Sequence, residues 1–180
     1  MNNISDKIKS SAEKVDNFLK KYFLKKNTQN SLFEAMNYGL FSGGKKIRSY
    51  ITKCAFEIYK IDEYKYIPIA GAIECVHSYS LIHDDLPSMD NDDFRRGKES
   101  THKKFGEANA ILAGNSLLTS AFEIISSDNL RIDHERKSNL TNSLALCAGH
   151  EGIAGGQYLD LKYENEQKDE KEIINYINFF

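Results

Sequence analysis

Apolar residues recur at three- and four-residue intervals along most of this chain, and this spacing constrains its fold more than any other feature. It is the spacing of the buried face of an amphipathic helix. The clearest case lies within residues 4–24, where the apolar positions are Ile4, Ile8, Val15, Phe18, Leu19 and Phe23. Apolar–polar alternation over five or more residues is hard to find, and two prolines and eleven glycines are spread over 180 residues. The sequence therefore predicts an all-α fold in one domain, residues 1–180.

Further helices are predicted to begin near residues 32, 47, 68, 103 and 139, with polar or glycine-containing segments between them. The helix that begins at 47 is predicted to run to about residue 59. Ile47, Ile51 and Ile58 are expected on its buried side. Pro68 is expected in the first turn of the next helix, where its missing N–H would have no partner in any case.

The overall charge and the cysteine content disfavour some classes of partner. The formal net charge is −2 and 41% of the residues are apolar, which favours neither nucleic acid nor a membrane surface. No segment is expected to span a membrane, and the N-terminus lacks an apolar leader. The three cysteines are widely spaced and form no C-x-x-C pair, so a reduced, cytoplasmic protein is expected.

Residues 80–97 concentrate more charged chemistry than any other window of that length. The window holds two adjacent arginines and five aspartates, which are Asp84, Asp85, Asp90, Asp92 and Asp93. The first two acids follow an apolar helical stretch, so they lie near a helix C-terminus, where its partial negative charge and their mutual repulsion disfavour them. A cation would neutralise them, and carboxylate oxygens suit Mg²⁺. A solvated acidic turn is the alternative.

The proline at position 87 determines how these acids are arranged. Pro87 disfavours helical geometry in the preceding residue, so the helix is predicted to end near Asp85, with Asp90 on an irregular turn. A loop must then return Asp90 toward Asp84. His77 precedes Asp84 by seven residues, which places both on one face of the helix. A histidine that is only part of the core is the alternative.

Residues 43–48, GGKKIR, form a second candidate site. Counted from Gly39 they approach a phosphate-binding P-loop, but that motif follows a strand and ends in Ser or Thr, whereas this segment follows a helix and has Lys46 there. The remaining interpretation is an anion site at a helix start, with exposed backbone N–H groups and with Lys45 and Arg48 one turn apart. A solvated basic turn is the alternative.

Two weaker features complete the set. Arg95 and Arg96 point to different sides and suit bidentate phosphate binding, or they only neutralise the nearby aspartates. Gln157 and Asp160 follow the pair at 155–156 at helical spacing, although glycine capping of a helix explains part of that motif. Together these features indicate an enzyme that binds two phosphorylated substrates side by side.

The same segments resemble motifs of the short-chain polyprenyl diphosphate synthases, most closely the bacterial farnesyl diphosphate synthases. The matching segments are GGKKIR at 43–48, HSYSLIHDDLPSMDNDDFRRG at 77–97, THKKFGEANAILAGNSLL at 101–118 and GGQYLDL at 155–161. The resemblance implies a helical bundle of the isoprenoid synthase type and a homodimer. It also implies Mg²⁺-dependent condensation of isopentenyl diphosphate with dimethylallyl or geranyl diphosphate to give farnesyl diphosphate.

The resemblance further implies a role for each matching residue. The residues that would hold Mg²⁺ against the allylic diphosphate, with Arg95 assisting, are Asp84, Asp85 and Asp90. The residues that would form the isopentenyl diphosphate pocket are Gly44, Lys45, Arg48, His77 and Arg96. Gln157 would lie near the allylic end of the site, and Asp160 would lie near a second metal region.

The position of Tyr79 bears on product length in this family. Tyr79 precedes Asp84 by five residues, about 7.5 Å along a helix axis. Its ring would therefore close the floor of the product cavity and stop chain growth at the farnesyl stage. Ordinary core packing of the ring is the alternative.

The chain departs from the family pattern in one respect. The second aspartate-rich motif and the Lys-Thr that precedes it are absent from the 180 residues. The expectation is therefore a single family domain that is incomplete and lacks its C-terminal helices. A catalytically impaired fragment, or a non-catalytic partner subunit, is the alternative to an active prenyltransferase.

Overall fold

The computed structural model describes residues 3–26, 30–164 and 170–177. Contacts between residues divide the chain into two compact units, residues 1–131 and residues 132–180. The two units are described separately below. Every candidate site residue except Gln157 and Asp160 lies in the first unit.

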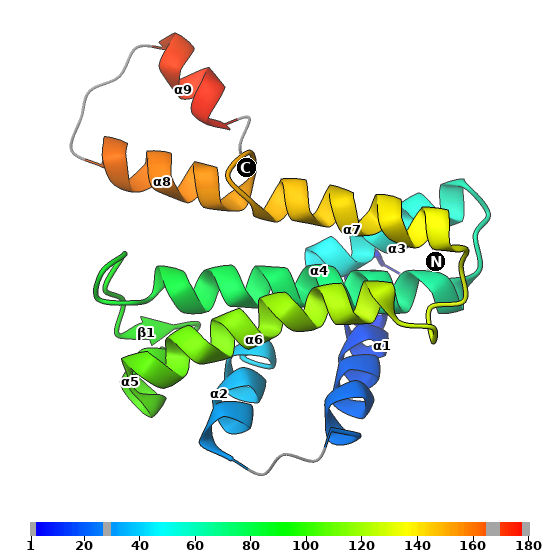
Figure 1. Ribbon diagram of the computed structural model, residues 1–180, viewed down its shortest axis with the longest axis horizontal. Coiled ribbons are helices and arrows are strands. Elements are labelled where there is room, and N and C mark those ends of the chain that lie inside the picture. The colour runs from blue at the N-terminus through cyan, green and yellow to red at the C-terminus, as the bar shows by residue number, and fades with distance from the viewer. Residues whose placement is uncertain (1–2, 27–29, 165–169, 178–180) are drawn as a thin grey trace. The chain divides into compact units, whose positions relative to one another are not determined.

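The first unit is built around one long central helix. Its helices are α1 (Ile4–Leu24), α2 (Ser31–Leu40), α3 (Ile47–Ile58), α4 (Glu63–Asp84), α5 (Thr101–Phe105) and α6 (Glu107–Ser126). Helix α4 packs against α1, α2, α3 and α6, and α6 runs beside it (Figure 1). The buried apolar side chains of α4 and α6, with those of α1 and α2, form the core. The all-α prediction is confirmed for the described residues, apart from one short hairpin.

That hairpin consists of β1 (Phe94–Arg95) and β2 (Lys98–Glu99), paired antiparallel. Arg96 and Gly97 form its two-residue turn, with φ of 54° and 76°. Two positive φ values in succession are typical of the turn type that matches the twist of a hairpin. The hairpin connects the C-terminal end of α4 to the N-terminal end of α5.

Local side-chain hydrogen bonds explain where several helices begin. The Asn30 side chain accepts a hydrogen bond of 2.9 Å from the N–H of Phe33, so it caps α2 as the polar segment before that helix predicts. Asn3 caps α1 in the same way. The observed bounds of α1 agree with the apolar spacing in residues 4–24.

The prediction that Pro68 lies in the first turn of α4 is wrong. The helix begins at Glu63, with Asp62 as its N-cap, so Pro68 lies inside it. A proline here removes the hydrogen bond that residue 68 would donate to the carbonyl of Tyr64. The burial of Tyr66 and Ile69 on either side of the proline favours the longer helix nonetheless.

The prediction that the isoleucines of α3 are buried is also wrong. Ile47, Ile51 and Ile58 have exposed fractions of 48%, 62% and 76%, whereas Ser49 is fully buried. Both the N–H and the hydroxyl of Ser49 donate hydrogen bonds to the buried Glu74 of α4. This polar contact, rather than the apolar stripe, determines which face of α3 meets α4.

Close contact between α4 and α6 depends on small residues. Ala110, Ala113 and Gly114 are buried on α6, and a Cβ on Gly114 would lie 2.3 Å from Nε2 of His83. The same nitrogen of His83 lies 3.1 Å from the carbonyl oxygen of Ile111, to which it can donate a hydrogen bond. The helices are therefore held together by both packing and a polar contact.

Helix α6 also corrects the expectation that no segment could span a membrane. Among the described residues, one helix is long and apolar enough to cross a bilayer, and that helix is α6. That composition is weak support for a membrane span, because a helix in the core of a folded unit has the same character. Its packing against α4 accounts for its buried apolar residues.

The second unit contains α7 (His134–Ala148), α8 (Ile153–Tyr163) and α9 (Glu170–Ile177). Helix α7 begins at His134, before the predicted start near residue 139, because Asp133 caps it with a 2.8 Å hydrogen bond from the N–H of Arg136. Gly155 and Gly156 lie inside α8 and do not terminate the preceding helix. Gln157 and Asp160 are on α8, as their helical spacing predicts.

Candidate functional site

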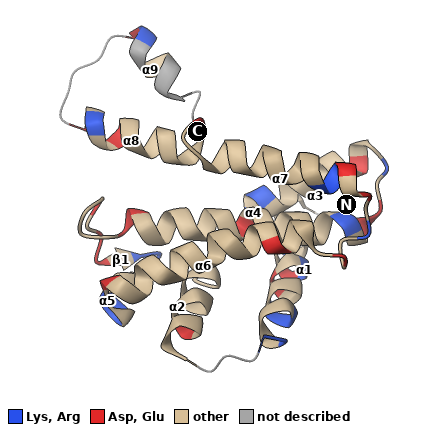
Figure 2. Ribbon diagram, in the orientation of Figure 1, with Lys and Arg blue, Asp and Glu red and all other residues tan. Residues whose placement is uncertain are grey.

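The C-terminal end of α4 presents the aspartates of the acidic segment. Helix α4 ends at Asp84 and Asp85 is its C-cap, as Pro87 predicts. The N–H of Asp90 donates a 2.9 Å hydrogen bond to the carbonyl oxygen of Asp84. The loop therefore returns Asp90 to the helix end, which confirms the predicted irregular turn. Acidic residues mark this helix end and the loop that follows (Figure 2).

Asp85 is buried, and it is paired with an arginine of the hairpin. Its Oδ1 accepts a 2.6 Å hydrogen bond from Nε of Arg95 and lies 2.5 Å from Nη2 of the same guanidinium. The Asp85 side chain is only 3% exposed. Arg95 therefore neutralises the acid that lies deepest at the negative end of the α4 dipole. Arg95, the first of the two adjacent arginines, thus neutralises a nearby aspartate, which is one of the two roles that the sequence allows for the pair.

Arg95 is not alone in balancing the acidic segment. Its Nη2 also lies 3.9 Å from a carboxylate oxygen of Asp92, and Nζ of Lys103 lies 2.9 Å from Asp93. Arg95 thus engages two of the five aspartates, Asp85 and Asp92, and the exposed Lys103 engages a third, Asp93. The backbones of Asp84 and Asp90 are joined by the hydrogen bond described above.

These carboxylates have the donor chemistry that Mg²⁺ prefers. Among the residues that the structure describes, no three His, Cys, Asp or Glu side chains come together as a ready metal cage. Mg²⁺ does not require such a cage, because it commonly binds one or two carboxylates together with waters and substrate phosphate. The donor set around Asp84 and Asp90 fits that mode of binding.

A cationic cavity of about 120 Å³ lies beside α4, at the start of α3. It is lined by Leu40, Ser42, Lys45, Lys46, Ile47, Arg48, Glu74, His77, Ser78, Leu81 and Arg96. Four of the five residues expected in the isopentenyl diphosphate pocket are among them. The structure therefore brings Lys45, Arg48 and His77 together with Arg96, which lies on the distant hairpin.

The fifth residue, Gly44, lies directly against Arg96. The guanidinium of Arg96 donates a hydrogen bond to the carbonyl oxygen of Gly43. A Cβ on Gly44 would lie 2.4 Å from Nη1 of Arg96, and Gly44 has φ of 102°. Both the backbone conformation and the nearby guanidinium therefore favour glycine at this position.

His77 is neutral at pH 7 in this cavity. Burial lowers the pKa of His77 to about 4, with further lowering by the nearby charges of Arg48 and Arg96. Nη1 of Arg48 lies 3.3 Å from Nε2 of His77. A guanidinium can only donate, so Nε2 accepts, which requires that this nitrogen carry no proton.

The lowered pKa of His77 predicts a pH dependence of stability. A histidine whose pKa is lower in the folded state stabilises that state fully above its ordinary pKa of 6.5, and the contribution is lost as pH falls toward 4. We expect a loss of about 1–2 kcal/mol, which is less than the full shift implies because His77 is partly exposed. Urea denaturation at pH 7 and pH 4 should show a steeper loss for the wild type than for His77→Gln. Equal losses in the two proteins would contradict the prediction.

Tyr79 lies on α4 between His77 and the acidic end. Its ring packs edge-on against the imidazole of His83, with 5.0 Å between ring centroids. Burial raises the pKa of the Tyr79 phenol, with a smaller contribution from the negative charge of Asp84. The ring is therefore fixed beside a neighbour on its own helix, one turn along.

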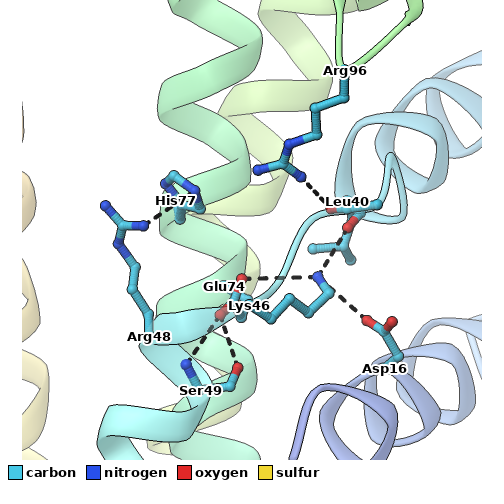
Figure 3. A network of polar contacts seen from close by, with 9 residues as sticks. Asp16, Leu40, Lys46, Arg48, Ser49, Glu74, His77 and Arg96 are labelled. Carbon is cyan, nitrogen blue, oxygen red and sulfur yellow. Dashed lines mark hydrogen bonds and ion pairs between the residues drawn. The ribbon is translucent and has the colours of Figure 1, made fainter. Parts of the chain in front are cut away.

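The sequence does not predict the polar contacts among Lys46, Ser49 and Glu74 at the cavity. Nζ of Lys46 lies 3.8 Å from Oε2 of Glu74, and Ser49 donates hydrogen bonds of 3.2 and 2.8 Å to Oε1 of the same carboxylate (Figure 3). Glu74 is 2% exposed. An acidic residue inside the apolar run AGAIECV was the available signal, because a buried carboxylate requires partners.

Gln157 and Asp160 are the two candidate residues outside the first unit. Both lie on α8, and Asp160 is exposed. The roles expected of Gln157 near the allylic substrate and of Asp160 near a second metal region remain predictions.

Comparison with known proteins agrees with the geometry. Residues 29–179 match the family described as polyprenyl synthetase. The farnesyl diphosphate synthase of Bacillus subtilis is 44% identical over 160 residues, which are 88% of this chain and 54% of that protein. A chloroplastic geranylgeranyl pyrophosphate synthase of Catharanthus roseus is 45% identical over 130 residues, 72% of this chain and 36% of that protein.

A solved structure shares the fold. The geranyltransferase of Legionella pneumophila superposes with a TM-score of 0.90 at 34% identity, over 96% of this chain and 61% of that structure. The chain spans about half the length of the bacterial relatives that it matches. The family match covers most of the chain, and the fold agrees with it. The protein belongs to the polyprenyl synthetase family.

Proposed function

We propose that this chain carries the diphosphate-binding part of a farnesyl diphosphate synthase. The observation that supports the proposal best is the cavity in which Lys45, Arg48, His77 and Arg96 meet. His77 and Asp84 are seven residues apart on α4, which is about 10 Å along the helix axis. A cationic pocket and an acidic helix end at that separation suit two diphosphates bound side by side.

In this proposal the cavity binds isopentenyl diphosphate and the acidic end binds the allylic diphosphate, dimethylallyl or geranyl. Lys45, Arg48 and Arg96 neutralise the first diphosphate, and neutral His77 adds a hydrogen-bonding group without another positive charge. Asp84, Asp85 and Asp90 face the second diphosphate through Mg²⁺, with Arg95 assisting. Asp85 and Arg95, which are paired with each other, hold the helix end and the hairpin in place.

The allylic C–O bond breaks, and pyrophosphate leaves with the bonding electron pair. The isopentenyl double bond then attacks the allylic cation, and loss of a proton from the resulting cation completes the condensation. Bound Mg²⁺, held by Asp84, Asp85 and Asp90 with Asp160 as a candidate for a second region, would stabilise the negative charge on the departing pyrophosphate. The protein separates the two diphosphates and orients the reacting carbons near one another.

Binding of isopentenyl diphosphate to the purified chain tests the proposal. Isothermal titration calorimetry should detect binding by the wild type, weakened about tenfold or more by Arg48→Gln, since a hydrogen bond to a charged group contributes about 1.5–3 kcal/mol. Lys53→Gln is a matched control on the same helix, because Lys53 pairs with Glu57 instead of lining the cavity. Failure of the wild-type chain to bind would contradict the proposal.

A Mg²⁺-dependent assay with geranyl and isopentenyl diphosphates separates the two remaining functions. Formation of farnesyl diphosphate by the chain alone would support a complete catalytic site. Intact binding without product would favour the alternative, a catalytically impaired fragment or a non-catalytic partner subunit.

Replacement of Tyr79 tests whether its ring limits product length. In a preparation that makes product, Tyr79→Ala should shift the product from farnesyl toward longer prenyl diphosphates, because it removes a fixed ring from the α4 face below Asp84. Tyr79→Phe keeps the ring and should keep the farnesyl product. Chromatography of the dephosphorylated products measures the change. An unchanged product from Tyr79→Ala would leave core packing as the role of Tyr79.

The remaining proposals follow from the family and from composition. A cytoplasmic location is supported by the absence of disulfides at the three free cysteines, Cys54, Cys75 and Cys147. A homodimer and the absence of nucleic-acid and membrane partners are proposed on the resemblance and the near-neutral charge. Size-exclusion chromatography with light scattering would test the dimer.

A further inference from the structure

The ammonium group of Lys46 is surrounded by oxygens from three helices. It donates a 3.2 Å hydrogen bond to the carbonyl of Leu40 and lies 3.3 Å from Oδ1 of Asp16 and 3.8 Å from Oε2 of Glu74 (Figure 3). The Lys46 side chain is 6% exposed. An ammonium has three donors, and three oxygens already surround this one. Lys46 therefore lines the cavity without being available to a phosphate.

The backbone of Lys46 is in a conformation that favours glycine. Lys46 is the N-cap of α3, with φ of 45° and ψ of 51°, and its side chain makes no capping hydrogen bond. A left-handed backbone is disfavoured for a residue with a Cβ. The backbone alone therefore gives no reason for lysine at this position, whereas the buried contacts of its side chain do.

Glu74 holds the chain on both sides of Arg48. It contacts Lys46 before Arg48, and it accepts two hydrogen bonds from Ser49 after it. Arg48 is thereby oriented so that its Nη1 lies 3.3 Å from His77. The carboxylates of Asp16 and Glu74 also offset positive charge where cations gather at a helix N-terminus, an arrangement that the helix dipole disfavours.

We infer that Lys46 is a positioning residue that fixes loop 43–48 on Glu74 and Asp16, so that Arg48 meets the diphosphate in the cavity. The inference rests on the proposed function of that cavity. It assigns the two adjacent lysines different tasks: Lys45 faces the ligand, and Lys46 anchors the loop. The orienting effect of such an anchor on binding is large, because small displacements of a positioned group are costly.

Isopentenyl diphosphate binding, measured by calorimetry, tests the inference with two matched variants. Lys46→Gly relieves the backbone and removes the anchor, and it should raise Kd about tenfold. Lys60→Gly is the control, since Lys60 has φ of 53° and an exposed side chain at the end of α3. It should leave Kd unchanged. A wild-type Kd for Lys46→Gly would overturn the inference while the proposed function stood.

A double variant distinguishes positioning from direct binding. If Lys46 acts through Arg48, then Arg48→Gln should weaken binding much less in the Lys46→Gly background than in the wild type. Equal effects in both backgrounds would overturn the inference. If Lys46→Gly does not fold, Glu74→Gln replaces it, because it keeps an oxygen for Ser49 and removes the charge that faces Lys46. If the wild type binds nothing, the proposed function fails, and this inference fails with it.

Discussion

Glu74→Ala is expected to lower the free energy of unfolding of the first unit by about 3–5 kcal/mol. The variant leaves the ammonium of Lys46 without its α4 partner in a site where it is 6% exposed. It also removes the acceptor of both hydrogen bonds from Ser49, which is fully buried. Unpaired buried polar groups incur their full desolvation cost. Urea denaturation followed by circular dichroism measures the loss.

Glu57→Ala provides the matched control for this prediction. Glu57 also pairs with a lysine, Lys53, but its side chain is 63% exposed. Exposed ion pairs contribute little, so the control should change stability by less than about 1 kcal/mol. Glu74→Gln should fall between the two, because the amide keeps an acceptor for Ser49. Similar losses for Glu74→Ala and Glu57→Ala would show that the buried cluster does not stabilise this unit.

The end of α4 could be predicted from the sequence, because a single proline determines the backbone conformation there. Pro87 specifies the helix end near Asp85, and the return of Asp90 follows from that end. The start of the same helix was mispredicted, because the Pro68 signal is weaker than the burial of the residues around it. A proline inside a helix costs one hydrogen bond, and packing can offset that cost.

Contacts between distant segments could not be predicted from spacing alone. Ser49 and Glu74 are 25 residues apart, and their hydrogen bonds orient α3 against the expectation from its isoleucines. An apolar stripe predicts a buried face only where no stronger polar contact competes for it. The cluster around Lys46 was missed for the same reason.

The sequence predicts most of the residues that line the cationic cavity, but not how they are brought together. Lys45 and Arg48 share a turn, and His77 was placed by its alignment with Asp84, but Arg96 reaches them from a hairpin that the sequence-based interpretation does not contain. Its strands are two residues long, too short to show alternation. A residue followed by glycine, as in Arg96-Gly97, is a signal for such a turn. The resemblance to the family, not periodicity, grouped Arg96 with the others.

The second large effect is expected at the ion pair between Asp85 and Arg95. Arg95→Met should lower the free energy of unfolding by about 2–3 kcal/mol, because it leaves a buried carboxylate at the negative end of the α4 dipole. This loss is smaller than is usual for a fully buried ion pair, because the Arg95 side chain is 26% exposed. Lys103→Met, which removes an exposed partner of Asp93, should cost less than about 1 kcal/mol.

A double-mutant cycle assigns this loss to the pair. Asp85→Asn alone leaves Arg95 able to donate a hydrogen bond to an amide oxygen. In the Asp85→Asn background, Arg95→Met no longer leaves a buried carboxylate without a partner. The two changes should therefore couple by about 2 kcal/mol. Additive losses would mean that Arg95 stabilises the hairpin by packing alone. Coupling would show that the charge pair between Asp85 and Arg95 holds the end of α4 to the hairpin.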